Sequence, residues 1–105
     1  MTYRADGWTA LGDPTRRAIF ACLAEQPRAV GELASELPVS RPAVSQHLKV
    51  LKQAGLVVDC PVGNRRVYQL DLNGVDALRA QLDRFWTKGL AAYKAAAEQS
   101  TEEFA

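Results

Sequence analysis

The chain has 105 residues, of which 48% are hydrophobic and 24% charged, and its formal net charge is +1. These values are typical of one soluble globular domain, residues 1–105, and they exclude a disordered chain or a chain with two separate cores. No apolar run approaches the roughly 20 residues that span a membrane, and the N-terminus lacks the apolar stretch of a signal peptide. We therefore expect a cytoplasmic protein without membrane contact.

The charges are not spread evenly along the chain. Residues 1–40 carry four basic and five acidic side chains, and residues 73–105 again carry four and five. Residues 41–72 carry five basic and only two acidic side chains. A local basic excess of this kind is the electrostatic pattern that DNA binding requires.

Two helices are predicted before Pro27. The first is short and has three apolar side chains on one face: Tyr3, Trp8 and Leu11. Asp13-Pro14 then predicts a new helix, because an aspartate caps it and proline fits its first position. The inner face of this second helix has four small or apolar residues: Ala18, Ile19, Cys22 and Leu23. Arg16 and Arg17 are expected to point outward, and Cys22 is expected to act as a core side chain.

A pair of closely spaced helices follows, at about residues 30–54. Val30, Leu33, Ala34 and Leu37 form an amphipathic pattern that Pro38 closes. The next helix has Ser40 as its N-cap and Gly55 as its stop. Its inward stripe has three apolar residues: Val44, Leu48 and Leu51. Two helices joined by such a short turn predict a helix-turn-helix unit, whose second helix reads DNA bases.

The other face of this second helix carries hydrogen-bond donors, amides and hydroxyls but no carboxylate. Its side chains are Arg41, Ser45, Gln46, Lys49, Lys52 and Gln53. A helix in the major groove of DNA needs such a face. A merely solvated face is the alternative, and the preceding helix and short turn favour the DNA-reading interpretation.

A β-hairpin is predicted at about residues 56–71. The β-prone runs 57–62 and 65–70 are separated by Gly63-Asn64, a two-residue hairpin turn. Arg65 and Arg66 directly follow the turn and predict a wing that touches phosphates or the minor groove. The alternative is a charged edge that prevents strand aggregation.

A long last helix is predicted at about residues 73–98, with Asn73 as its cap and a fraying tail from Gln99 to Ala105. Its apolar stripe is too long for a domain of this size to bury by itself, and folding back across the small core would cover only part of it. We therefore expect a homodimer whose interface uses the terminal helices. The candidate interface residues are Trp8, Leu78, Leu82, Phe85, Trp86, Leu90 and Tyr93.

Three segments resemble the ArsR/SmtB family of bacterial repressors. They are residues 11–20 (LGDPTRRAIF), 40–57 (SRPAVSQHLKVLKQAGLV) and 63–70 (GNRRVYQL). The resemblance implies a mainly α fold with a small β-hairpin, a winged helix-turn-helix with four helices, two strands and a last helix. It also implies a homodimer that binds a palindromic double-stranded DNA operator and releases it when an effector binds.

Carried over residue by residue, the resemblance implies which side chains meet DNA. Ser45, Gln46 and His47 would lie at the DNA, flanked by Arg41 and Lys49. Gln46 is the best candidate for base readout, since its amide can pair with adenine. Ser40 and Ser45 would bind phosphate or cap the helix, and Lys49, Arg65 and Arg66 would bind the phosphate backbone. Simple packing is the alternative for His47.

The sequence departs from the family at its known metal sites. Metal sensors carry CVCDL where this chain has residues 29–33, AVGEL. The zinc-type positions on the last helix hold four residues that bind zinc poorly: Leu72, Gly74, Phe85 and Lys88. We expect no metal at these sites and no cofactor. Three alternatives stay open: a small-molecule effector, oxidation of Cys60, or a response only to protein concentration.

The function expected from the sequence is therefore a sequence-specific transcriptional repressor. The alternative is a winged-helix module that binds protein. Two features argue against this alternative: the reading face has no acidic residues, and the wing is basic. An enzyme is not expected, because the chain has no plausible Ser-His-Asp set, P-loop, GxGxxG motif or metal cluster.

Overall fold

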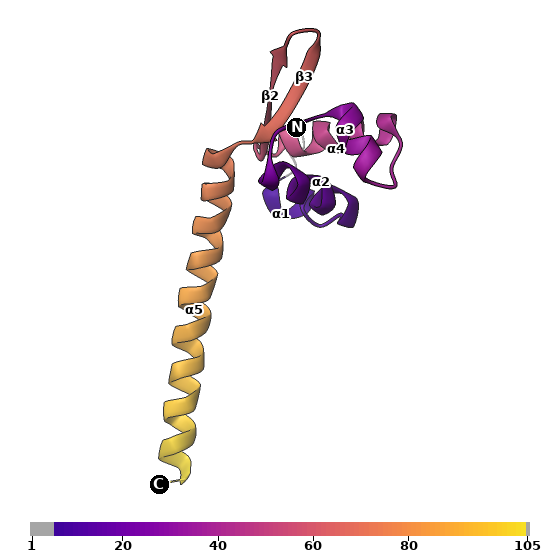
Figure 1. The fold of residues 1–105 in the computed structure, drawn as a ribbon. Coiled ribbons are helices and arrows are strands. Elements are labelled where there is room, and N and C mark those ends of the chain that lie inside the picture. Colours follow the sequence, from indigo (N-terminus) through magenta and orange to yellow (C-terminus); the bar gives the residue numbers. More distant parts are fainter. Residues whose placement is uncertain (1–5, 105) are drawn as a thin grey trace, which may run out of the picture.

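The computed structural model describes residues 6–104, so the predicted role of Tyr3 lies outside the described residues. The elements are α1 (Gly7–Ala10), α2 (Pro14–Glu25), β1 (Arg28–Ala29), α3 (Val30–Glu36), α4 (Arg41–Gln53), β2 (Val57–Val62), β3 (Arg65–Leu70) and α5 (Leu72–Phe104). Helices α1 to α4 form a compact body, from which the β2–β3 hairpin and α5 project in opposite directions (Figure 1). The predicted winged helix-turn-helix fold is confirmed.

The signals that begin and end α2 and α4 act as predicted. The carboxylate of Asp13 accepts a hydrogen bond from the backbone N–H of Arg16 at 3.0 Å, and Ser40 Oγ accepts one from the N–H of Ala43 at 3.3 Å. At the end of α4, Gly55 adopts a φ of 78°, which favours glycine. The N–H of Leu56 then reaches back to a carbonyl of the last turn, as in a Schellman motif.

The core lies between the four short helices and the base of the hairpin. Its fully or almost fully buried residues are Ala10, Ile19, Leu23, Leu33, Val44, Leu48, Leu51, Leu56 and Val57. The three residues predicted as the inward stripe of α4 are all among them. Burial of this stripe leaves the opposite face of α4 free.

The sheet contains one strand that sequence reasoning missed. Its order is β1-β3-β2, and both pairings are antiparallel. β1 has only two residues, with Arg28 paired to Tyr68, so it is too short to show any period along the sequence. Val62 pairs with Arg65 across the turn, where Gly63 has a φ of 64°. The predicted two-residue hairpin is therefore confirmed and is extended by β1.

Three local predictions were wrong. Arg16 is half-buried, and its Nε donates a hydrogen bond to the carbonyl oxygen of Ala10 at 2.6 Å, so it does not point outward. Asp71, not Asn73, caps α5, because its carboxylate accepts from the N–H of Asn73 at 3.1 Å. Helix α5 does not fray at Gln99 but continues to Phe104, beyond the predicted end near residue 98.

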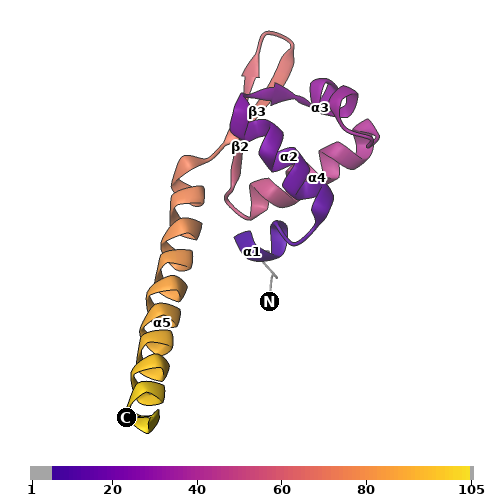
Figure 2. The ribbon, with the colours of Figure 1, turned by 60° about the horizontal axis from the view of Figure 1, so that its bottom comes forward.

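Helix α5 leaves the body after its first turns. Val75 and Leu78 pack against the core, whereas the rest of the helix extends away from every other element (Figure 2). The molecule measures 70 × 32 × 25 Å, with a radius of gyration of 19.2 Å. A compact chain of this length has a radius of gyration of about 13 Å. The C-terminal two thirds of α5 therefore lack a partner within the chain.

Gly74 lets α5 begin directly against the turn after α4. A Cβ at Gly74 would lie 1.7 Å from the carbonyl oxygen of Gly55, and the N–H of Asp71 binds the carbonyl of Leu56 at 2.9 Å. A methyl group there must push two backbone segments apart. Gly74→Ala should lower the free energy of unfolding by about 1–3 kcal/mol in urea titrations. The control Asn73→Ala, exposed on the same turn, should change it by less than about 0.5 kcal/mol, and equal stability of the two variants would contradict this account.

Candidate nucleic-acid interface

The exposed face of α4 carries the side chains predicted to read DNA. Arg41, Ser45, Gln46 and Lys49 are all exposed, and no acidic residue occurs in the helix. Ser40 is exposed as well, but its hydroxyl already caps the helix through Ala43. The structure thus brings the predicted reading side chains together on one face.

His47 differs from the other predicted reading residues because it is half-buried. Its Nδ1 is buried and has no hydrogen-bond partner among the described atoms. The imidazole also contributes to lowering the pKa of Asp13, although the backbone N–H of Arg16 is the main cause of that shift. His47 therefore lies at the border between the reading face and the packed side of α4, near the start of α2.

The two arginines of the wing are exposed, but each is paired with a carboxylate. Arg65 binds Glu32 of α3, and Arg66 binds Asp59 of β2 with a distance of 2.6 Å from Nη1 to Oδ2. Glu32 also accepts a hydrogen bond from the N–H of Ala29, which is the main cause that lowers the pKa of its carboxyl. Both wing arginines are thus held by carboxylates before DNA is present, Arg65 by the body and Arg66 by the neighbouring strand of the wing.

Asp59 and Glu32 are site residues that sequence reasoning missed. The side chain of Asp59 is only 6% exposed, and its Oδ1 lies 2.6 Å from Nζ of Lys52 on α4. The register of the hairpin could have predicted the pair of Asp59 and Arg66. Asp59 lies opposite Tyr68, so Arg66, two residues before Tyr68, is its diagonal neighbour on the same face of the sheet. The contacts to α3 and α4 depend on tertiary packing and had no signal in the sequence.

A groove of about 270 Å³ lies between the wing and the helix-turn-helix. It is lined by Ala29, Val30, Gly31, Arg41, Asn64, Arg65 and Arg66. Arg41 Nη2 would be 3.6 Å from a Cβ at Gly31, so its guanidinium lies against the start of α3. Three arginines, one from α4 and two from β3, therefore line one groove, which suits an anionic ligand such as a phosphate.

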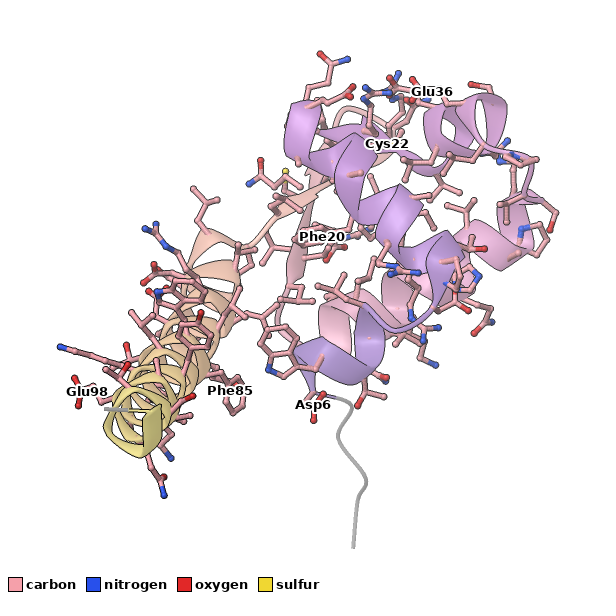
Figure 3. The ribbon with its side chains drawn as sticks, turned by 90° about the horizontal axis from the view of Figure 1, so that it is seen from below. Asp6, Phe20, Cys22, Glu36, Phe85 and Glu98 are labelled. Atoms are coloured by element: carbon pink, nitrogen blue, oxygen red, sulfur yellow. The ribbon has the colours of Figure 1, made fainter. Side chains whose placement is uncertain are left out.

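The apolar face predicted for dimerisation is exposed along α5. Phe85 is 63% and Trp86 68% exposed, and Leu82, Leu90 and Tyr93 are also exposed. Viewed along α5, Phe85 and Glu98 lie on opposite sides of the helix, with no other element against Phe85 (Figure 3).

The two remaining interface candidates contact their own chain. Leu78 is half-buried and packs against the core, close enough to Gly7 that a Cβ there would lie 2.9 Å from a methyl of Leu78. Trp8 Nε1 donates a hydrogen bond to Gln81 Oε1 at 2.7 Å. These contacts fix the direction in which α5 leaves the body.

Neither cysteine is in a disulfide. Cys22 packs against the core near Glu36, and burial is the main cause that raises the pKa of its thiol (Figure 3). Cys60 is exposed on β2. Among the residues that the structure describes, no group of three or more His, Cys, Asp or Glu side chains is placed to hold a metal ion.

Within residues 6–104, no helix is both long enough and apolar enough to cross a bilayer.

Comparisons with known proteins agree with this geometry. A family model described as a helix-turn-helix domain matches residues 11–60. The HTH-type transcriptional regulator Rv2034 of Mycobacterium tuberculosis (strain H37Rv) is 66% identical over 94 residues, which is 88% of each chain. The HTH-type transcriptional repressor SmtB of Mycobacterium tuberculosis (strain CDC 1551) is 48% identical over 61 residues, 58% of this chain and 45% of SmtB.

A solved structure supports the same assignment. The ArsR-like transcriptional regulator from Rhodococcus sp. RHA1 superposes with a TM-score of 0.71 at 34% identity, covering 86% of this chain and 88% of that one. Identity at this level over most of both chains establishes a family and not only a fold. The chain belongs to the ArsR/SmtB family of winged helix-turn-helix, DNA-binding transcriptional regulators.

Proposed function

We propose that this regulator is a homodimeric repressor that binds a palindromic operator through α4 of each subunit. The observation that carries the proposal is the exposed, acid-free face of α4, held outward by the buried stripe on its other side. A face of this composition matches the donors and acceptors of the major groove. Similarity to the repressor SmtB supports repression as the outcome of binding.

Gln46 reads bases in this proposal, and the basic side chains bind the backbone. Gln46 is exposed in the N-terminal half of α4, the part of a recognition helix that approaches base edges. Lys49 and Arg41 flank it and supply the salt-dependent phosphate contacts, with Ser45 beside them. Arg65 and Arg66 add phosphate contacts from the wing, on the same groove as Arg41.

The second copy of the chain packs on the exposed apolar face of α5. Isolated apolar side chains are common on protein surfaces, but α5 carries a continuous exposed patch. The patch is formed by Leu82, Phe85, Trp86, Leu90 and Tyr93. The body of the chain does not cover this patch, so burying it against the same patch of a second copy would supply the hydrophobic free energy that stabilises a symmetric dimer. The dimer then places two α4 helices on two half-sites.

A DNA-binding assay tests the proposal directly. Purified protein should bind a labelled fragment of its own upstream region more tightly than random DNA, and affinity should fall steeply between 50 and 200 mM salt. Adding a chelator should leave the affinity unchanged, since the described residues include no metal cluster. Equal binding to all DNA fragments, or binding that ignores salt, would favour a protein-interaction module instead.

The role of Gln46 can be tested in the same assay. Gln46→Ala removes one bidentate base contact, so operator binding should weaken by about 1–3 kcal/mol while binding to random DNA changes far less. Gln99→Ala makes the same change at an exposed position of α5, outside the reading face, and as the matched control should have little effect. Equal losses on both DNAs for Gln46→Ala would exclude base readout by this side chain.

The dimer can be tested by placing a charge in the apolar face. Phe85→Asp should shift the protein to monomers in sedimentation velocity, because an aspartate in a dry interface would be left unpaired. Operator affinity should fall as well, since the two half-sites, about 34–36 Å apart, must be bound together. Thr87→Asp, which adds the same charge to another side of α5, should leave the dimer intact, and a persisting Phe85→Asp dimer would move the interface elsewhere.

A further inference from the structure

The outer part of the wing has little apolar support. In β2 only Val57, at the base of the hairpin, is buried, whereas Val62 near the tip is 56% exposed. Both strands are exposed along residues 60–66. Hydrophobic packing therefore does not determine where the tip of the wing lies relative to α4.

Asp59 makes the polar connection that replaces such packing. Its two carboxylate oxygens bind two different elements: Oδ1 binds Lys52 on the last turn of α4, and Oδ2 binds Arg66 on β3, each at 2.6 Å. Both cations are more than half exposed, whereas the carboxylate between them is almost completely covered. Hydrogen bonds from Lys52 and then Arg66 lower the pKa of Asp59, so the connection is ionised at neutral pH.

The location of this carboxylate is unfavourable for DNA binding as such. Asp59 is one of only two acidic residues in the basic segment 41–72, and it neutralises charge on the surface that would face phosphates. A negative charge there lowers affinity for every DNA sequence equally. What it adds is geometry, because it ties the wing to the end of the recognition helix.

We propose that Asp59 is a positioning residue for DNA recognition: by holding Lys52 and Arg66 together, it fixes the wing relative to α4 and raises the discrimination between operator and random DNA. The proposal rests on the proposed function, since discrimination presupposes an operator. A wing held in one orientation contacts backbone phosphates in one register, which reinforces the register read by α4. A free wing contacts any phosphates within reach.

The Arg65–Glu32 pair offers an internal comparison. In this pair, too, a carboxylate binds an arginine of the wing. Unlike Asp59, however, Glu32 binds a single basic side chain, and both partners are well exposed, at 44% for Glu32 and 57% for Arg65. Exposed single pairs of this kind are weak and can exchange partners with a phosphate. Glu32→Gln therefore removes an equal charge from beside the other wing arginine without breaking the connection to α4. Its remaining amide oxygen can still accept from the N–H of Ala29.

The experiment compares Asp59→Asn with Glu32→Gln on the operator fragment bound by the wild type and on random DNA. Glu32→Gln should tighten binding to both, because a negative charge is removed. Asp59→Asn should tighten binding to random DNA but weaken operator binding about tenfold, the lower end of the loss for one mismatched base pair. If Asp59→Asn tightens operator binding as Glu32→Gln does, Asp59 acts only through its charge and the proposal is overturned.

A second measurement needs no DNA and separates this proposal from the proposed function. In hydrogen exchange of the free protein, the backbone amides of the outer wing, residues 60–66, should exchange faster in Asp59→Asn than in the wild type. The amides of α2 should stay protected in both proteins, which would show that the variant is folded. Unchanged exchange in the wing would overturn the positioning role even if the operator is bound. A different result would be a wild type that binds all DNA fragments equally, together with faster amide exchange in the wing of the variant. That result would refute the proposed function but would establish that Asp59 holds the wing to α4.

Discussion

Burial of one stripe of α4 is the constraint on which the rest of the DNA-facing surface depends. Val44, Leu48 and Leu51 are fully buried, and a helix that hides these positions must present Gln46 and Lys49 to the outside. Loss of any of the three would open a cavity and also loosen the orientation of the reading face. Stability and the proposed DNA recognition therefore depend on the two sides of the same helix.

The wing follows a different physical rule. Its base is tied by Val57 and by the β1 pairing, but its outer half is held by charge through Asp59, whereas Arg65 forms only an exposed pair with Glu32. Charge screening by salt weakens exposed ion pairs but does not weaken hydrophobic contacts. The helix-turn-helix should thus keep its geometry over a wide range of ionic strength, while the pair of Arg65 and Glu32 responds to salt and to phosphate.

Most of the fold could be predicted from the sequence because its elements are marked by local signals. The caps at Asp13 and Ser40, the stop at Gly55 and the turn at Gly63 each act within a few residues, and all were found as predicted. One wrong prediction depended on a tertiary contact, because Arg16 turns inward to the carbonyl of Ala10. The other two concern the ends of α5, where Asp71 and not Asn73 is the cap and the helix continues to Phe104.

The candidate site could be predicted only in part. The reading face of α4 followed from helical periodicity. The carboxylates that hold the wing arginines lie 33 and 7 residues away from them in the chain, and no local pattern announces the first of these pairs. For His47 the resemblance to relatives implied a DNA contact, whereas its half-buried ring shows how packing competes with that role. Periodicity thus identifies a reading face, but the partners of each charge have to come from the folded structure.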